Sequence, residues 1–304
     1  MTLGNYMRGE FTEQLTGETT AQQTEAPDAY LDLLKKVLTA SIYDESAWVR
    51  IEAARSRRQR NFLRLDQFIK ALARSIFVRT LRNHNQILVT QKAFEPTIRS
   101  NGMDWPLFGY TMVGHKRLDN LHFCINDVLR RRVPGDLIET GVWRGGSTIF
   151  MRAALKVAGD SDRTVWVADS FEGLPVPKDS RDGADFSHVE HLAVSIEQVR
   201  ANFARFDLLD AQVRFLKGWF CDTLATAPIE RLAVLRLDGD LYSSTMDALE
   251  ALYPKVSPGG YVIVDDYGSW PECKRAVDEY TNKNNIQVDL NVIDGTGVFW
   301  RVES

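Results

Sequence analysis

Four aspartates in the C-terminal third of the chain each follow a short apolar run that predicts a buried strand. They are Asp238, Asp240, Asp265 and Asp266. The first pair follows the run 233–237, and the second follows the run 261–264, which comes after a predicted Pro-Gly-Gly turn at 258–260. Apolar residues at helical spacing over 245–253 predict a crossover helix, so the two strands are expected to be parallel neighbours. Parallel strands end together at the sheet edge where open α/β folds bind ligands.

Three of these carboxylates, Asp238, Asp265 and Asp266, are therefore expected to converge. Like charges held close together raise one another's pKa, and a hard divalent cation relieves that repulsion. Ligand sets made only of oxygen suit Mg²⁺, with Ca²⁺ or Mn²⁺ as alternatives. Without a metal, the acids would be solvated loop starts or helix caps. Asp240 stands apart as a candidate cap for the next helix, in competition with the two serines that follow it.

A glycine-bearing loop at 139–147 is the second candidate site, between a strand that begins at 137–138 and a helix at 148–157. Glycines let the backbone approach a ligand, and the first amides of a helix face it. The dinucleotide fingerprint GxGxxG does not fit, because Trp143 stands where a glycine is expected. Glu139 and the loop backbone are predicted to hold the charged amino-acid end of S-adenosylmethionine. A tight strand-to-helix connection without a ligand is the alternative.

The next predicted strand, 164–168, ends at Asp169, with Ser170 and Phe171 beside it. An acid at the end of a strand that neighbours the glycine loop is placed to accept the hydroxyls of a ribose, as in dinucleotide domains. Asp169 is therefore the predicted ribose ligand.

A third strand at 213–216 is followed by Gly218, Trp219 and Phe220. Either aromatic ring could stack on adenine, and packing in the core is the alternative. Both are therefore candidate cofactor contacts.

The segment 175–192 lacks strong periodicity and contains His188 and His191. Long irregular segments beside a cofactor site often act as lids over the substrate, and an ordinary surface loop is the alternative. Neither histidine is assigned a role.

Composition excludes several classes of protein. The chain has 304 residues, 44% of them hydrophobic, a net charge of -4 and three widely spaced cysteines. Such a charge gives no general attraction to nucleic acid, and the cysteines indicate neither a disulfide framework nor a thiolate metal site. The sequence contains no run of about 18 apolar residues, so no membrane span is predicted. Without a secretory signal, a cytoplasmic location is expected.

The chain divides into three predicted parts. Residues 1–28 are polar and read as a disordered tail, 29–132 as an N-terminal helical and lid region, and 133–304 as the cofactor-binding domain. The basic stretch 48–82 could form an amphipathic helix facing RNA or a membrane. The overall acidic charge favours a solvated or oligomer-forming helix instead. Two final strands, 288–293 and 298–302, are predicted to close the sheet with an antiparallel strand.

Five long blocks of sequence resemble the macrocin O-methyltransferases of the TylF/MycF/NovP type, which act on sugars of antibiotics. The blocks are TMVGHKRLDNL (111–121), PGDLIETGVWRGGSTIFMRA (134–153), VWVADSFEGLP (165–175), RLDGDLYSSTMDAL (236–249) and PKVSPGGYVIVDDYG (254–268). Ungapped blocks of this length are far more specific than any short glycine pattern.

The resemblance implies an α/β fold of the class I methyltransferase type, which is Rossmann-like and doubly wound. Its sheet is seven-stranded and mostly parallel, with an antiparallel C-terminal strand and an N-terminal helical layer. It implies S-adenosylmethionine as donor, Mg²⁺ held by Asp238, Asp265 and Asp266, and Asp238 as general base. It also implies a homodimer or higher homo-oligomer and a glycosylated small-molecule acceptor, without nucleic-acid or membrane partners. The expected cofactor contacts are Thr111, Met112, Glu139, Thr140, Gly141, Ser147, Asp169, Ser170, Phe171, Gly218, Trp219, Phe220 and Asp238.

Other functions remain open at this stage. A catechol also presents two adjacent oxygens to Mg²⁺ and is an alternative acceptor. Asp238-Gly-Asp240 is formally the DxD motif of metal-dependent glycosyltransferases, although the second acid pair argues against that class. A non-catalytic protein that binds RNA or lipid would use the basic stretch. His115 is a second candidate base. Neither the acceptor nor the oligomer size is specified by the sequence.

Overall fold

The structure is a computed structural model of the 304-residue chain. It describes residues 26–43, 47–50, 73–74, 76–78, 80–81, 83–84, 86, 88–104 and 107–303. Most of the predicted tail and most of the basic stretch 48–82 lie outside the described residues. The last three residues of that predicted tail belong to a helix, 26–38, which begins before the expected position of 29.

A seven-stranded sheet forms the centre of the fold, in the order β5-β4-β3-β6-β7-β9-β8. Its strands are β3 (Asp136–Thr140), β4 (Val165–Asp169), β5 (Val213–Lys217), β6 (Leu232–Leu237), β7 (Val256–Val264), β8 (Asn291–Val292) and β9 (Val298–Arg301). The first five strands in chain order are parallel, and β9 lies antiparallel between β7 and β8. The predicted class I sheet is confirmed. The strand order reverses between β3 and β6, which makes that point the expected ligand site.

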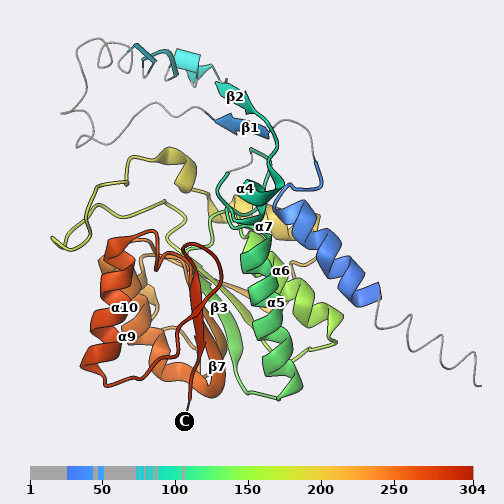
Figure 1. Ribbon diagram of the computed structural model, residues 1–304, viewed down its shortest axis with the longest axis vertical. Helices are drawn as coiled ribbons and strands as arrows, with labels where there is room; N and C mark the ends of the chain where they lie inside the picture. Colours follow the sequence, from blue (N-terminus) through green and yellow to red (C-terminus); the bar gives the residue numbers. More distant parts are fainter. Residues whose placement is uncertain are drawn as a thin grey trace, which may run out of the picture.

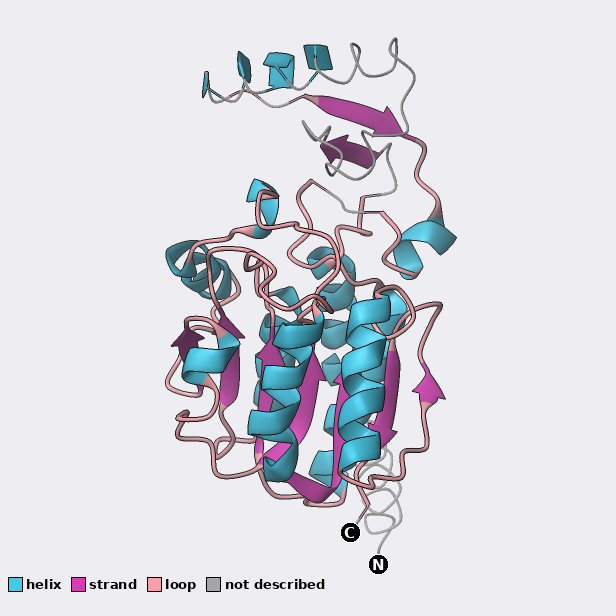
Figure 2. Ribbon diagram, turned by 90° about the vertical axis from the view of Figure 1, so that its left-hand side faces the viewer, coloured by secondary structure: helices cyan, strands magenta, loops and turns pink. Residues whose placement is uncertain are grey.

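Helices cover both faces of the sheet (Figure 1). The described helices include helix 26–38, α4 (Pro96–Ser100), α5 (His115–Arg130), α6 (Gly146–Val157), α7 (Ile196–Arg205), α8 (Phe220–Thr223), α9 (Tyr242–Leu252) and α10 (Pro271–Lys283), with short 3-10 turns η1 (Glu190–Leu192) and η2 (Tyr253–Lys255). Figure 2 looks onto the side of α9 and α10 and shows the strands running behind them.

The sheet separates two hydrophobic cores because successive strand residues point to opposite faces. Leu137 of β3 packs with α5, α6 and α7, whereas the next residue, Ile138, packs with α9 and α10. Strands buried on both faces need near-continuous apolar sequence, which explains why the short runs could be recognised.

Several features of the fold differ from the sequence-based expectation. The strand predicted at 288–293 spans only Asn291–Val292. The predicted turn at 258–260 is instead part of β7, where the pairing register with β6 shifts. Gly259 adopts a φ of 83° there and its N–H donates to the Val302 carbonyl at 2.7 Å, so this stretch is an irregularity within a paired strand. The N-terminal region also contains an unexpected antiparallel pair, β1 (Ala47–Arg50) with β2 (Val89–Lys92).

No helix in the described part of the chain is both long and apolar enough to cross a membrane.

Candidate active site

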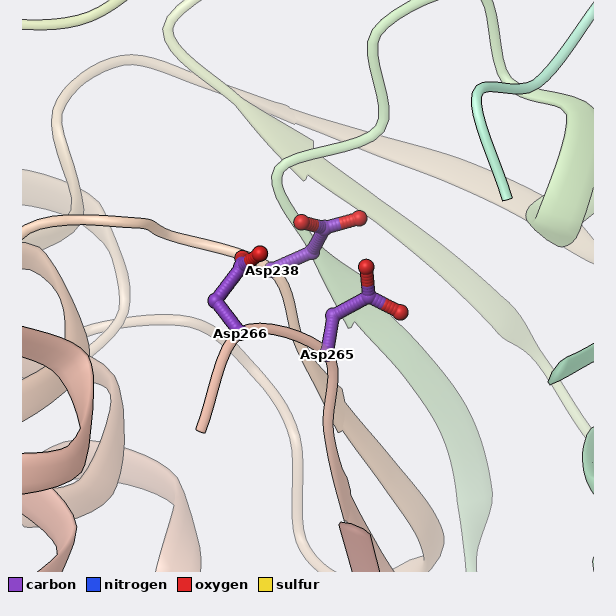
Figure 3. A group of neighbouring side chains, drawn as sticks. All are labelled: Asp238, Asp265 and Asp266. Atoms are coloured by element: carbon purple, nitrogen blue, oxygen red, sulfur yellow. The ribbon is translucent and has the colours of Figure 1, made fainter. Parts of the chain in front are cut away.

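Asp238, Asp265 and Asp266 lie together where β6 and β7 end (Figure 3). The register pairs Leu237 with Val264, so the acids that follow these two residues are adjacent. One carboxylate oxygen from each aspartate lies within 4.8 Å of the others. The expected convergence is therefore present, and metal binding by these three residues stays a prediction.

Two buried arginines balance part of this negative charge. Arg236 is only 2% exposed and ion-pairs with Glu139, Asp238 and Asp265, with a distance of 2.8 Å from Nη1 to Asp238 Oδ2. Arg117 of α5 ion-pairs with Asp265 from the other side. Asp265 is thus held between two guanidinium groups, and the cluster is both acidic and internally paired.

The remaining acids are held in an environment that disfavours their charged form. Burial, reinforced by the neighbouring carboxylates, raises the pKa of Asp266 well above its usual value. Burial also raises the pKa of Asp240 to about 7, with Asp238 adding to the rise. Among the described residues, Oδ2 of Asp266 has no hydrogen-bond partner. A buried carboxylate oxygen without a donor fits a hard cation, so the donor set is compatible with Mg²⁺.

A cavity of about 670 Å³ opens beside the acids. Of the predicted cofactor contacts, those on its wall are Met112, Gly141, Asp169, Ser170, Trp219, Phe220 and Asp238. Five others are buried and do not line the cavity, namely Thr111, Glu139, Thr140, Ser147 and Phe171. Gly218 also lies off the lining as described. The predicted loops therefore line one cavity, but only some of the predicted cofactor contacts lie on its wall.

The glycine loop passes very close to the acid loop. Gly141 has a φ of 90°, and a Cβ atom there would lie 1.8 Å from the Asp238 carbonyl oxygen. Only glycine fits such a position. The Asp169 carboxylate accepts hydrogen bonds from the backbone N–H groups of Val142 and Phe171, both at 2.7 Å. Asp169 thus joins the glycine loop to the end of β4, and burial raises its pKa despite these bonds.

Comparison with known proteins identifies the family. The macrocin O-methyltransferase (TylF) family profile matches residues 27–302. The chain belongs to this family. It is 50% identical to the demethyldecarbamoylnovobiocin O-methyltransferase of Streptomyces niveus, over 83% of this chain and 97% of that protein. It is 46% identical to the mycinamicin III 3''-O-methyltransferase of Micromonospora griseorubida, over 78% and 96%. The solved structure of the O-methyltransferase NovP is 45% identical, has a TM-score of 0.73, and is matched over 91% of this chain and 100% of that one.

As a macrocin O-methyltransferase family member, the chain is an S-adenosylmethionine-dependent O-methyltransferase. The cavity between the glycine loop and the acids is accordingly where donor and acceptor are expected to meet. The rival assignment to the glycosyltransferases is wrong, since the matches span most of the chain and name methyltransferases.

Within the described residues, the wall of the cavity of about 670 Å³ includes none of the three histidines considered from the sequence. His115 instead hydrogen-bonds with Ser41 at 2.5 Å and with Thr39 at 3.1 Å, next to helix 26–38. His191 lines a separate cavity of about 530 Å³ beside α7, and His188 lines neither cavity. His115, the first residue of α5, is therefore bonded to the turn after helix 26–38 and does not line the cavity. This position does not favour it as the base.

Three further residues were not singled out in the sequence. Arg236 and Arg117 pair with the acid cluster, and Asp182 is buried in the irregular segment 175–192. Arg236 could have been found, since an arginine inside the apolar run LAVLRL must be paired if the strand is buried. Arg117 and Asp182 carry no such local signal.

Proposed function

We propose that this methyltransferase transfers a methyl group from S-adenosylmethionine to a sugar hydroxyl of a glycosylated natural product. The relatives that support this are named for the O-methylation of demethyldecarbamoylnovobiocin and for the 3''-O-methylation of mycinamicin III. The observation that carries the proposal is the convergence of three carboxylates beside a cavity that the glycine loop also lines. Asp238, Asp265 and Asp266 would hold Mg²⁺.

The chain's own residues suit this reaction. Bound Mg²⁺ would lower the pKa of the acceptor hydroxyl and help to orient it. Asp238 lies on the cavity wall with its side chain 26% exposed, and accepts the hydroxyl proton as general base. The acceptor oxygen then bonds to the methyl carbon as the carbon–sulfur bond breaks, and S-adenosylhomocysteine leaves. The glycine loop and Asp169 would hold the donor beside the acceptor, which supplies the proximity that the reaction needs.

Two measurements test the proposal, one of cofactor binding and one of methyl transfer. Isothermal titration of S-adenosylmethionine, with EDTA or with Mg²⁺, should show binding in both conditions. Methyl transfer to demethyldecarbamoylnovobiocin, to mycinamicin III and to a simple catechol should require Mg²⁺ and favour a glycosylated acceptor. Absence of cofactor binding would overturn the assignment of the donor, and preference for the catechol would overturn that of the acceptor.

Asp238→Asn tests the role of the base. It should lower turnover by about 100-fold or more, the range for loss of a general base, while cofactor affinity stays close to that of the parent. Asp240→Asn is the matched comparison, because Asp240 is a neighbouring acid on the same wall. Loss of turnover in Asp240→Asn with retained turnover in Asp238→Asn would assign the proton to Asp240 instead.

The family resemblance also favours a cytoplasmic homo-oligomer, and light scattering on the purified protein tests its size.

A further inference from the structure

The segment 174–192 passes over the start of α9 and α10 (Figure 1). Leu174, Pro175, Val176, Lys178 and Asp179 from its first part line the same cavity as Asp238 and Asp240, and so does Leu192 at its end. The two helices beneath it are the next helices after the two acid pairs, since α9 begins at Tyr242 and α10 at Pro271. Contacts that hold this segment to the helix starts therefore lie near the loops that carry the two acid pairs.

Asp182 makes the central attachment. Asp182 is only 1% exposed, and its Oδ1 accepts a hydrogen bond from the Ser243 backbone N–H at 2.7 Å. Its Oδ2 accepts from the Ser243 hydroxyl at 3.0 Å. Leu241, the N-cap of α9, provides no side-chain cap of its own. Asp182 thus supplies, from 61 residues away, the carboxylate that the start of this helix favours.

Neighbouring residues strengthen the attachment. The Arg181 guanidinium lies 3.9 Å from the centre of the Tyr242 ring, and its Nη1 donates to the Tyr242 hydroxyl at 2.5 Å. Further along the segment, the Phe186 ring packs edge to face against the Trp270 ring, with 5.0 Å between the ring centres. Trp270 is the N-cap residue of α10. The segment is therefore attached to both helix starts by contacts of different chemistry.

We propose that Asp182 is a positioning residue that holds segment 174–192 closed over the cavity. By capping α9, it also ties closure to the loop of Asp238 and Asp240, which leads into that helix. The proposal rests on the proposed function, because the ligand under the cover is the cofactor. Opening the segment is then expected to control the release of S-adenosylhomocysteine after transfer.

The test compares three variants with the parent protein. Release of S-adenosylhomocysteine is followed by stopped-flow fluorescence. We expect Asp182→Ala to release it about tenfold faster, the change that corresponds to about 1.4 kcal/mol. Asp182→Asn keeps an oxygen that accepts from Ser243 N–H, so its rate should return to within about threefold of the parent. Asp185→Ala is the matched control, because Asp185 bonds only with Ser187 in its own exposed turn among the described residues. Equal rates in parent and Asp182→Ala would overturn the proposal.

Hydrogen exchange separates this proposal from the proposed function. Peptides that cover 174–192 and the start of α9 should exchange faster in Asp182→Ala than in the parent, with or without cofactor, and Asp185→Ala should leave α9 unchanged. Unchanged exchange in Asp182→Ala would overturn the attachment itself. If the parent binds no S-adenosylhomocysteine, the proposed function fails while the exchange result still decides whether Asp182 holds the segment. Ser243→Ala removes only the bond from the Ser243 hydroxyl to Asp182 and should show a smaller increase in exchange than Asp182→Ala.

Discussion

Replacing Arg236 with methionine removes a fully buried cation from the centre of the acid cluster. The side chain lies within β6, between Glu139 on β3 and Asp265 after β7, and also pairs with Asp238. Methionine keeps much of the length and volume but leaves three carboxylates without this partner. The effect should therefore come mainly from charge and little from packing.

The expected loss of stability is large. Removing one partner of a buried ion pair costs about 3–5 kcal/mol, because the other charge stays buried without compensation. Each kcal/mol lowers the melting temperature of a domain of this size by about 2–4 °C, so the variant should melt about 6–20 °C below the parent in EDTA. Mg²⁺ should return part of the difference, because a bound cation neutralises some of the same carboxylates and stabilises the folded state by mass action.

The deficit should depend on pH in a defined direction. Burial already raises the pKa of Glu139 to about 8 in the folded protein, although Arg236 opposes that rise. Without Arg236 the folded-state pKa rises further above its unfolded value, so the folded state binds the extra proton. Stability from such a group is fully present below the unfolded pKa and is lost as the pH rises through the folded pKa. The difference from the parent should therefore be smaller at pH 5.5 than at pH 8.5.

Circular dichroism melts in EDTA and in Mg²⁺, at both pH values, measure this effect. Arg214→Met is the control, since Arg214 lies exposed on β5 of the same sheet and its loss should change stability by about 0.5 kcal/mol or less. If Arg236→Met melted within about 2 °C of the parent in EDTA, the argument that Arg236 offsets the acid cluster would be refuted.

Two further predictions concern other parts of the chain. Cys221 is exposed on the cavity wall whereas Cys124 and Cys273 are buried, so a thiol reagent should label one cysteine rapidly, and S-adenosylhomocysteine should slow that labelling. Mass spectrometry of the labelled peptides checks both points; fast labelling of a second cysteine would contradict the burial. Burial favours a higher pKa for Asp127, but hydrogen bonds from Arg131, Arg130 and Tyr261 outweigh it and hold the pKa well below its usual range. Asp127→Asn should thus be less stable than the parent at pH 7, by about 1–3 kcal/mol, with the difference shrinking as the pH falls from 4.5 to 2.5. Urea unfolding across that range measures it, and a constant difference would exclude the ionic origin.

The parts of the fold that the sequence predicted are those in which local pattern and burial coincide. The runs at 233–237 and 261–264 are apolar because both faces of a central strand are buried. The helix between them has one apolar face, so its period is visible. From two such strands and a right-handed crossover, the meeting of Asp238 with Asp265 follows without further information. The same reasoning placed Asp169 beside the glycine loop.

Features that depend on register or on distant partners could not be predicted. The irregularity in β7 arises where Gly259 and Gly260 hydrogen-bond with Val302, just after the last strand, while the register with β6 shifts. The dipeptide Gly259-Gly260 alone reads as a turn. Asp182 lies in a segment without periodicity, and its partner at Ser243 is defined only once segment 174–192 is folded over α9. Sequence spacing carries no information about such contacts.

Arg236 combines a feature that the sequence predicts, its pairing with acids, with one that it does not, the choice of partners. A charged residue in the middle of a buried strand cannot remain unpaired, because transferring an isolated charge into the interior is far too unfavourable. The sequence therefore requires that acids lie beside Arg236, and it offers several within reach. Which of them pair is decided by the strand register, which sets Arg236 opposite Glu139 on one side and Ile263, two residues before Asp265, on the other. The arginine explains how so many carboxylates can share one sheet edge before any metal binds. It also implies that Mg²⁺ at the proposed site would compete with an existing ion-pair network, so that its affinity would depend on residues that need not touch the metal.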